Sequence, residues 1–202
     1  MLISFNLIPP LHTCALSKEL VPTTSNLNFI DSEGNDLPLT FVFAVQPLIN
    51  GTKRTLLARS DYSNNNNVFE INELANNSLE VKLFMDSENY LIFTSEAEVI
   101  PNKAHSIMIS YNPNTKNITA YVSARKVALS RTEAGIFTHL NKETMLPITS
   151  YVIDSNSEKS QYVNSNVGVV SIIKKALTDE EIRAFALTLE ASMGNNPCIQ
   201  TY

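Results

Sequence analysis

The sequence has no tryptophan, only five glycines and only two cysteines among its 202 residues. So few cysteines exclude a disulfide-rich scaffold, and no Gly-rich loop for cradling phosphate is present. Lysine and arginine never form a run longer than two, and the net charge is −5, so nucleic acid is not an expected partner. No apolar run approaches the roughly 20 residues of a membrane-spanning helix, so we expect no membrane insertion.

Spacings that bind zinc are also missing. Neither His-x-x-x-His nor Cys-x-x-Cys occurs, so a zinc site is not expected. The three histidines are far apart in the sequence, at His12, His105 and His139. Nothing in the sequence points to a Ser-His-Asp arrangement either.

Glycoside hydrolases need two carboxylates pointing into one groove, which on a strand requires alternate positions. Glu70 and Glu73 are three residues apart and therefore face opposite sides of a strand. Glu96 and Glu98 have the required spacing, but no third acidic residue accompanies them, and a solvated strand edge explains them more simply. We therefore predict a protein without catalytic residues and keep a glycoside-processing enzyme as the least favoured alternative.

Alternation of apolar and polar residues dominates the chain, whose 44% apolar and 17% charged residues are typical of a globular protein. Strand-like alternation is clear in segments bounded by turn signals. They are 37–47, 69–73, 79–86, 105–111 and 117–124. A further run, 166–173, is apolar on both faces, as expected for a central strand covered on both sides. The pattern predicts an all-β antiparallel β-sandwich of roughly a dozen short strands, in a single domain spanning 1–202.

One helix is strongly specified near the end of the chain, within SIIKKALTDEEIRAF (171–185). Thr178 is placed to cap its first turn, and Glu181 three residues later completes a capping box. Leu177 and Ile182 are spaced as a hydrophobic staple. The predicted apolar stripe comprises Ile182, Phe185, Ala186, Leu189 and Met193. Gly194 ends the helix, so we expect one amphipathic C-terminal α-helix packed against the strands.

Three segments, in order, resemble laminin-G-like, concanavalin-A-like jelly-roll domains. LTFVFAVQPLINGTKRTLLARSD (39–61) resembles the early strand pair of that family, and HSIMISYNPNTKNITAYVSARKVAL (105–129) its central hairpin. NVGVVSIIKKALTDEEIRAF (166–185) resembles its closing strand and helix start. Together the matches span residues 27–193. Phe43 and His105 stand where the family usually carries tryptophan.

The resemblance implies a jelly roll whose first and last strands lie side by side, with the helix at the rim of the sandwich. That arrangement implies a disulfide between Cys14 and Cys198. The alternative is two free thiols in a reducing compartment.

Sugar binding in such folds generally combines an aromatic platform with hydrogen bonds from Asn or Asp. The candidate ligand-binding residues are Tyr62, Asn64, Asn65, Asn66 and, in the next hairpin loop, Tyr90. The alternative is that both tyrosines cap the core and the asparagine run is an exposed loop.

Calcium is the only cofactor that the sequence brings into question, because many jelly-roll lectins use it. It requires six to eight oxygen ligands, typically including carboxylates. Asp61 and Asp86 are the candidate ligands, but neither lies in a spaced ligand motif. No metal site is assigned on this basis.

These features favour a non-enzymatic recognition or assembly module. The N-terminal segment has no basic region and is interrupted by Pro9 and Pro10, unlike a secretory signal. A lectin-like fold without such a signal suits a bacteriophage or other virion protein, such as a capsid-decorating, fibre or tail component. Its partners would be other virion proteins, copies of itself or host-cell glycans. The alternative is an extracellular carbohydrate-binding or adhesion module of a larger surface protein.

Overall fold

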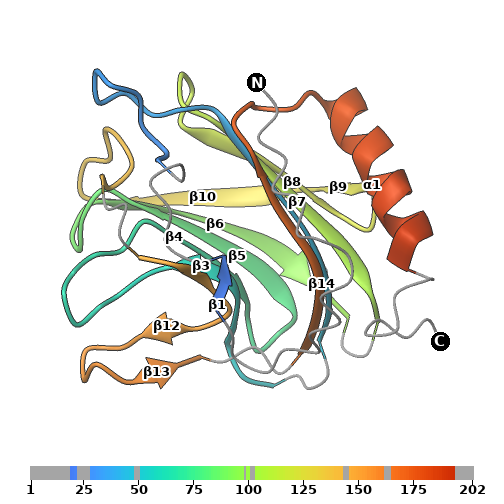
Figure 1. Cartoon of the computed structure of the whole chain (residues 1–202), viewed down its shortest axis with the longest axis horizontal. Helices are drawn as coiled ribbons and strands as arrows, with labels where there is room; N and C mark the ends of the chain where they lie inside the picture. The colour runs from blue at the N-terminus through green and yellow to red at the C-terminus, as the bar shows by residue number, and fades with distance from the viewer. Residues whose placement is uncertain are drawn as a thin grey trace.

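The computed structural model describes residues 19–21, 28–47, 51–97, 99–100, 103–142, 146–161 and 165–193. Their strands form two large antiparallel sheets and one small hairpin. A single helix follows the last strand, near the C-terminus (Figure 1). The prediction of an all-β antiparallel sandwich with one C-terminal helix is therefore confirmed.

The larger sheet has seven strands. In spatial order they are β1 (Glu19–Val21), β11 (Ile148–Thr149), β3 (Arg54–Arg59), β4 (Phe69–Glu73), β5 (Ser78–Phe84), β6 (Tyr90–Ala97) and β10 (Leu129–Ala134). The smaller sheet has five: β14 (Ser165–Ile173), β2 (Leu39–Pro47), β7 (His105–Asn112), β8 (Asn117–Val122) and β9 (Arg125–Val127). The hairpin pairs β12 (Val152–Ile153) with β13 (Lys159–Ser160), and the helix is α1 (Asp179–Met193).

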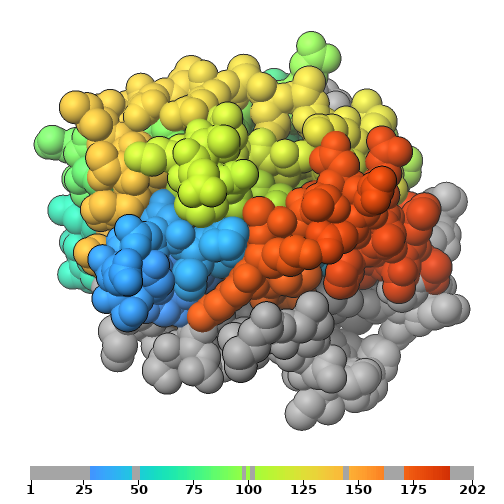
Figure 2. Space-filling view, turned by 90° about the horizontal axis from the view of Figure 1, so that it is seen from above, coloured from blue at the N-terminus to red at the C-terminus, as the bar shows by residue number. Residues whose placement is uncertain are grey.

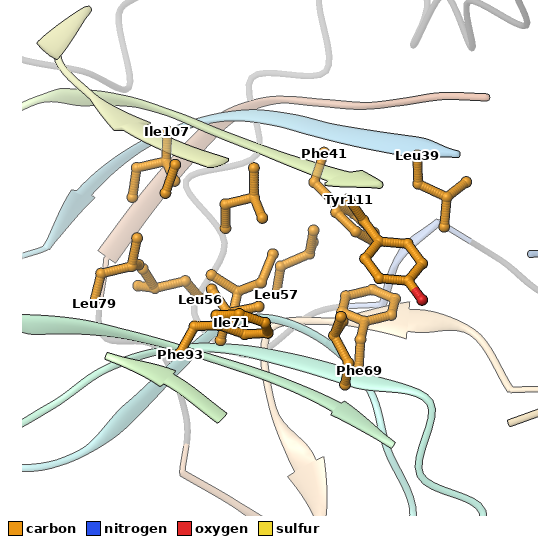
Figure 3. Packing of buried hydrophobic residues seen from close by; sticks show 14 of the residues in the cluster. Leu39, Phe41, Leu56, Leu57, Phe69, Ile71, Leu79, Phe93, Ile107 and Tyr111 are labelled. Carbon is orange, nitrogen blue, oxygen red and sulfur yellow. The ribbon is translucent and has the colours of Figure 1, made fainter. Parts of the chain in front are cut away.

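One cluster of buried side chains fills the space between the two sheets (Figure 3). Val122 is 3% exposed and Met85 and Ile118 are partly buried, but most of the residues predicted to share a face are at most 1% exposed, which confirms the alternation read from the sequence. They include Leu39, Phe41, Phe43, Val45, Phe69, Ile71, Leu79, Val81, Leu83, Ile107, Ile109 and Tyr111. Phe41 on one sheet and Phe69 on the other lie 4.6 Å apart between ring centroids. Removing this apolar surface from water is the main force that holds the sheets together.

The helix begins as its sequence requires. The Thr178 N–H donates to Glu181 Oε2 at 3.0 Å, and the Glu181 N–H donates to Thr178 Oγ1 at 3.3 Å. The predicted capping box is therefore confirmed. Asp179, Glu180 and Glu181 place three acidic side chains in the first turn, where they complement the positive end of the helix dipole.

The helix packs on the five-stranded sheet, against β7 and β8 on the side away from the main core, and not at the rim as the family resemblance implied. The reason is that β7 and β8 carry apolar side chains on the face away from the main core. Met108 and Tyr121 are fully buried there together with Ile182 and Ala186 of α1. Polar contacts hold both ends of the helix: Ser106 Oγ donates to Glu190, and Lys126 Nζ lies 2.8 Å from Asp179.

The predicted stripe is wrong at one position. Ile182, Ala186 and Leu189 face the sheet as predicted, whereas Phe185 remains 41% exposed. A narrow stripe suffices because the helix touches the sheet along one line, and Phe185 lies beside that line. The side chain of Met193 lies outside the described residues.

The run 166–173 was expected to be a central strand covered on both sides; among the described residues β14 pairs with β2 alone, so a central place in the sheet stays a prediction. Both of its faces are nonetheless covered, because Ile172 joins the main core and Ile173 joins the cluster under the helix. The apolar pattern of this run indicates that both faces of β14 are covered, but it does not indicate how many strands lie beside it. The implied pairing of first and last strands is also not seen, since β1 belongs to the other sheet. Cys14 and Cys198 lie outside the described residues, so their disulfide stays a prediction.

Candidate functional site

The register of the seven-stranded sheet aligns its outward-pointing side chains in rows. Leu79, Val81, Leu83, Leu91 and Phe93 point into the core, so their neighbours on β5 and β6 point outward. The first row is Ala58, Glu70, Lys82, Ile92 and Thr132; the second is Thr55, Asn72, Glu80, Thr94 and Ser130; the third is Phe84, Tyr90 and Ala134. We call this surface the outer face. Its side chains on β3 and β4 are fully buried, whereas those on β5, β6 and β10, except Phe84, are half-buried or exposed.

Three aromatic rings stand at one end of the outer face. Tyr62 meets Phe84 edge-on, with 6.3 Å between centroids, and Phe84 lies 5.5 Å from Tyr90. Phe84 is buried, whereas both tyrosines are half-buried. The structure thus brings together the two tyrosines that the sequence singled out. Tyr90 opens strand β6 and does not lie in a loop as predicted, because its pairing with Phe84 and Ala134 extends the sheet to that residue.

A buried glutamate anchors the polar part of the outer face. Glu70 is fully buried, with Ser60 Oγ 2.8 Å from Oε1 and the Asn72 amide donating to Oε2 at 3.2 Å. Tyr62 also hydrogen-bonds this carboxylate. Burial, followed by the charge of Glu70 and the hydrogen bond to it, raises the pKa of Tyr62 well above its usual value of 10. The phenol therefore stays protonated and acts as a donor toward Glu70.

A second glutamate, Glu80, connects this network to two lysines. The amide of Asn72 donates to Glu80 Oε1 at 3.1 Å as well as to Glu70. Lys53 Nζ lies 2.9 Å and Lys82 Nζ 4.0 Å from the same Glu80 oxygen. The side chain of Lys53 is 31% exposed, that of Glu80 12% and that of Lys82 19%. They present both donors and acceptors to a ligand on the outer face.

The asparagine run divides between structural and exposed positions. Asn64 is exposed, but its amide donates to Asp61 Oδ2 at 2.8 Å. Asn65 is exposed and adopts a left-handed backbone with φ of 55°, a conformation that asparagine tolerates better than most residues. Asn66 is half-buried, and Asn67 is fully buried with Oδ1 2.6 Å from Ser60 Oγ. Of the predicted asparagines, Asn65 is thus the freest to contact a ligand.

The two aspartates considered for calcium both stabilise their own turns. Asp61 is buried and accepts hydrogen bonds from the Ser63 backbone and hydroxyl and from Asn64. Asp86 accepts from the Glu88 and Asn89 backbones and from the Asn89 amide. These bonds hold the pKa of each carboxyl below its usual value, although burial works in the opposite direction and is the largest influence at Asp61. Within the described ranges, no three His, Cys, Asp or Glu side chains gather as metal ligands would.

The carboxylate pairs read from the sequence do not form a catalytic pair. Glu70 points to the outer face and Glu73 into the sandwich, where it meets Arg54, as their spacing predicted. Glu96 is exposed and Glu98 lies outside the described residues. Sequence reasoning missed Glu80, which shares Asn72 with Glu70. Its strand parity was readable, but its neighbour was not, because strand pairing is invisible in one sequence.

Two open hollows lie elsewhere on the surface. One, of about 490 Å³, lies where the 31–36 turn, the β7–β8 turn and segment 137–142 meet, the blue, yellow-green and gold regions of Figure 2. Its lining comprises Gly34, Asn35, Asp36, Pro113, Asn114, Thr138 and His139. The other, of about 360 Å³, opens between β8–β9 and β10. Neither is lined by a residue that the sequence analysis proposed for ligand binding. No helix in the part of the chain described here has the length and apolarity to cross a membrane.

The described strands define a two-sheet antiparallel β-sandwich. No family model matches the chain, and no curated protein matches its sequence. Among solved structures, the chain is similar to the IT-sialidase CBM40 of Ruminococcus gnavus, with a TM-score of 0.56 and 11% identity over 74% of this chain and 83% of that one. The same CBM40 bound to alpha2,3 sialyllactose matches with a TM-score of 0.54 and 12% identity, covering 85% and 97%.

The chain is also similar to the binding domain of botulinum neurotoxin serotype D. The TM-score is 0.58 and the identity 14%, over 82% of this chain but only 38% of the toxin chain. The chain therefore spans well under half of the toxin binding region that it matches. At these identities the likeness establishes the fold alone.

Proposed function

We propose that this protein is a non-enzymatic carbohydrate-recognition module that binds glycans on the outer face. One observation carries the proposal: Tyr62 and Tyr90 lie half-buried on either side of Phe84, at the end of a face whose polar side chains are both donors and acceptors. A sugar ring has an apolar C–H face that packs on aromatic rings and a rim of hydroxyls that need both kinds of partner.

Each part of the outer face has a role in this proposal. Tyr62 and Tyr90 form the aromatic platform, and their packing against Phe84 orders them before a ligand arrives. Such ordering lowers the entropy lost on binding. Glu80 accepts from sugar hydroxyls, while Lys82 and Thr94 donate to them, because these side chains remain partly exposed; Lys82 is in the row next to the aromatic end, and Glu80 and Thr94 are in the row after it.

The comparisons support this alternative of the sequence analysis over the virion role. One similar structure is a sialidase CBM40 bound to sialyllactose, and the toxin structures are described as receptor-binding domains. No comparison supports a bacteriophage or virion assembly role. Since glycans are displayed on cell surfaces, we propose that the protein works outside the cell, with glycans as its partners.

The test is titration calorimetry against the glycans selected by an array, with Tyr90→Ala, Tyr62→Phe and the wild-type protein. Aromatic packing contributes about 0.5–1.5 kcal/mol, so Tyr90→Ala should weaken binding roughly 3- to 10-fold. Tyr62→Phe keeps the ring and should bind nearly as well. Phe185→Ala, a partly exposed aromatic on α1, is the matched control. Equal affinity of Tyr90→Ala and the wild type would contradict the proposal that glycans bind on the outer face.

We further propose that binding does not require calcium, because the Asp61 and Asp86 carboxylates already accept hydrogen bonds within their own turns. The same titration in the presence of EDTA should give an unchanged affinity. Loss of binding in EDTA, restored by added calcium, would contradict this.

A further inference from the structure

We infer that the outer face recognises uncharged saccharides and discriminates against acidic ones; this inference rests on the proposed function and specifies its ligand. The similar CBM40 structure holds sialyllactose, a sugar with a carboxylate. The charged groups on the present chain favour a different ligand class.

The charges of the outer face cancel. Its described side chains include two carboxylates, Glu70 and Glu80, and two ammonium groups, Lys53 and Lys82. Both lysines are directed to one oxygen of Glu80, at 2.9 Å and 4.0 Å. Glu70 is fully buried, and in the described residues none of its hydrogen-bond partners is a lysine or arginine, although Lys82 stands opposite it in the strand register. An incoming carboxylate would thus meet no surplus positive charge, and Glu80, which is partly exposed, carries charge of its own sign.

The arginines of this sheet are also turned away from the outer face. A guanidinium is the side chain that best binds a carboxylate, through two parallel hydrogen bonds. Arg54 points into the sandwich and pairs with Glu73. Arg59 is fully buried, 5.4 Å from the Phe29 ring, and donates to the Leu146 carbonyl. Arg131 sits opposite the inward Phe93 and pairs with Glu133.

Neutral hydrogen-bonding groups complete the face. Thr94 is half-buried on β6, and Ser130 and Thr132 are exposed beside it on β10. Hydroxyls of this kind both donate and accept, as sugar hydroxyls do. A neutral sugar can therefore satisfy its polar groups here without an unpaired charge being buried, which is the costly outcome for an acidic one.

The experiment is calorimetric titration with lactose, with N,N′-diacetylchitobiose and with 3′-sialyllactose, at about 50 and about 500 mM NaCl to vary screening. A neutral probe should bind at least roughly 10-fold more tightly than sialyllactose, with an affinity that salt leaves unchanged. Tighter binding of sialyllactose that weakens with salt would overturn this inference alone. Silence toward every sugar on a broad array would overturn the proposed function itself, so the two failures are distinguishable.

A charge variant sharpens the test. Glu80→Gln leaves Lys53 and Lys82 without their shared carboxylate and should shift the affinity ratio toward sialyllactose several-fold, with new salt dependence. Glu180→Gln, an exposed position in the first turn of α1, makes the same change in net charge away from the outer face and should leave the ratio unaltered. An equal shift in both variants would show that net charge, and not Glu80, sets the preference, contradicting the inference.

Discussion

Arg54 and Glu73 form an ion pair inside the sandwich, with 2.9 Å between Nη2 and Oε1 and side-chain exposures of 4% and 0%. They sit opposite each other at the ends of β3 and β4. Within the part of the chain that the structure describes, Arg54 Nε and Nη1 and Glu73 Oε2 have no hydrogen-bond partner. Burial raises the pKa of Glu73, and the hydrogen bond and charge of Arg54 act against that rise.

Removing one partner of this pair should lower the free energy of unfolding far more than replacing both partners with apolar residues. Removing one partner of a buried pair leaves an unpaired charge and costs about 3–5 kcal/mol, so we expect Glu73→Ala to lower the free energy of unfolding by about that amount. Replacing both residues, as Arg54→Met with Glu73→Leu, should cost far less than the two single changes together. Urea unfolding of the three variants measures this, and additive costs would show that the pair acts as two independent groups.

The capping box predicts a smaller loss. Thr178→Ala removes the hydroxyl that accepts from the Glu181 N–H and should cost about 1 kcal/mol. Thr188→Ala is the matched control, because Thr188 is exposed on the same helix and its hydroxyl bonds only to Ala184. Thermal or urea unfolding compares them, and an equal effect in both variants would argue that Thr178 is not the cap.

Packing of α1 on the sheet separates two apolar residues that the sequence treats alike. Ile182 is fully buried against the five-stranded sheet, whereas Phe185 is 41% exposed. Ile182→Ala should cost about 2–5 kcal/mol, and Phe185→Ala well under half as much. If the two variants lost similar free energies of unfolding in urea, Phe185 would pack against the sheet as the predicted stripe implied, and not lie beside it as in the structure.

His105 predicts a loss of stability in mild acid. Its ring is 2% exposed, with Nδ1 3.0 Å from Ser123 Oγ and Nε2 beside the Ile100 backbone. Burial, with help from the charge of Lys103 and against the hydrogen bond to Ile100, lowers the pKa of His105 below the usual 6.5. Below about pH 6.5, the His105 imidazole therefore binds a proton more readily in the unfolded chain than in the folded chain. This stability is fully present above about pH 6.5 and declines as the pH falls toward the folded-state pKa.

Urea unfolding between neutral and mildly acidic pH should show this decline in the wild type, at no more than about 1.4 kcal/mol per pH unit. In His105→Gln the slope should flatten. His139→Gln replaces a half-buried histidine in a surface hollow and should keep it. Equal slopes in the wild type and in His105→Gln would contradict the assignment. The comparison with His105→Gln is needed because the pKa of Glu73 is raised, so its contribution to stability changes with pH in the opposite direction, whereas Asp31, Asp61 and Asp86, whose pKa values are lowered, titrate at more acidic pH.

The sequence predicted the two tyrosines of the candidate site but not the residues beside them. Tyr62 and Tyr90 stood out because sugar binding in such folds generally combines an aromatic platform with hydrogen bonds from Asn or Asp, and the structure places both against Phe84. Phe84 itself, Glu70 and Glu80 were not joined to them. Their proximity depends on which strands pair and in what register, and no local pattern records either.

By itself, the sequence determined the strand faces and the capped helix, because each depends on neighbours within a turn or a strand of one chain. Only the tertiary structure decided that β14 lies beside β2, that Phe185 misses the sheet, and that Glu80 holds Lys53 and Lys82 in balance on the outer face. These contacts join segments far apart in the chain, and they arise when the two sheets stack to remove their shared apolar surface from water.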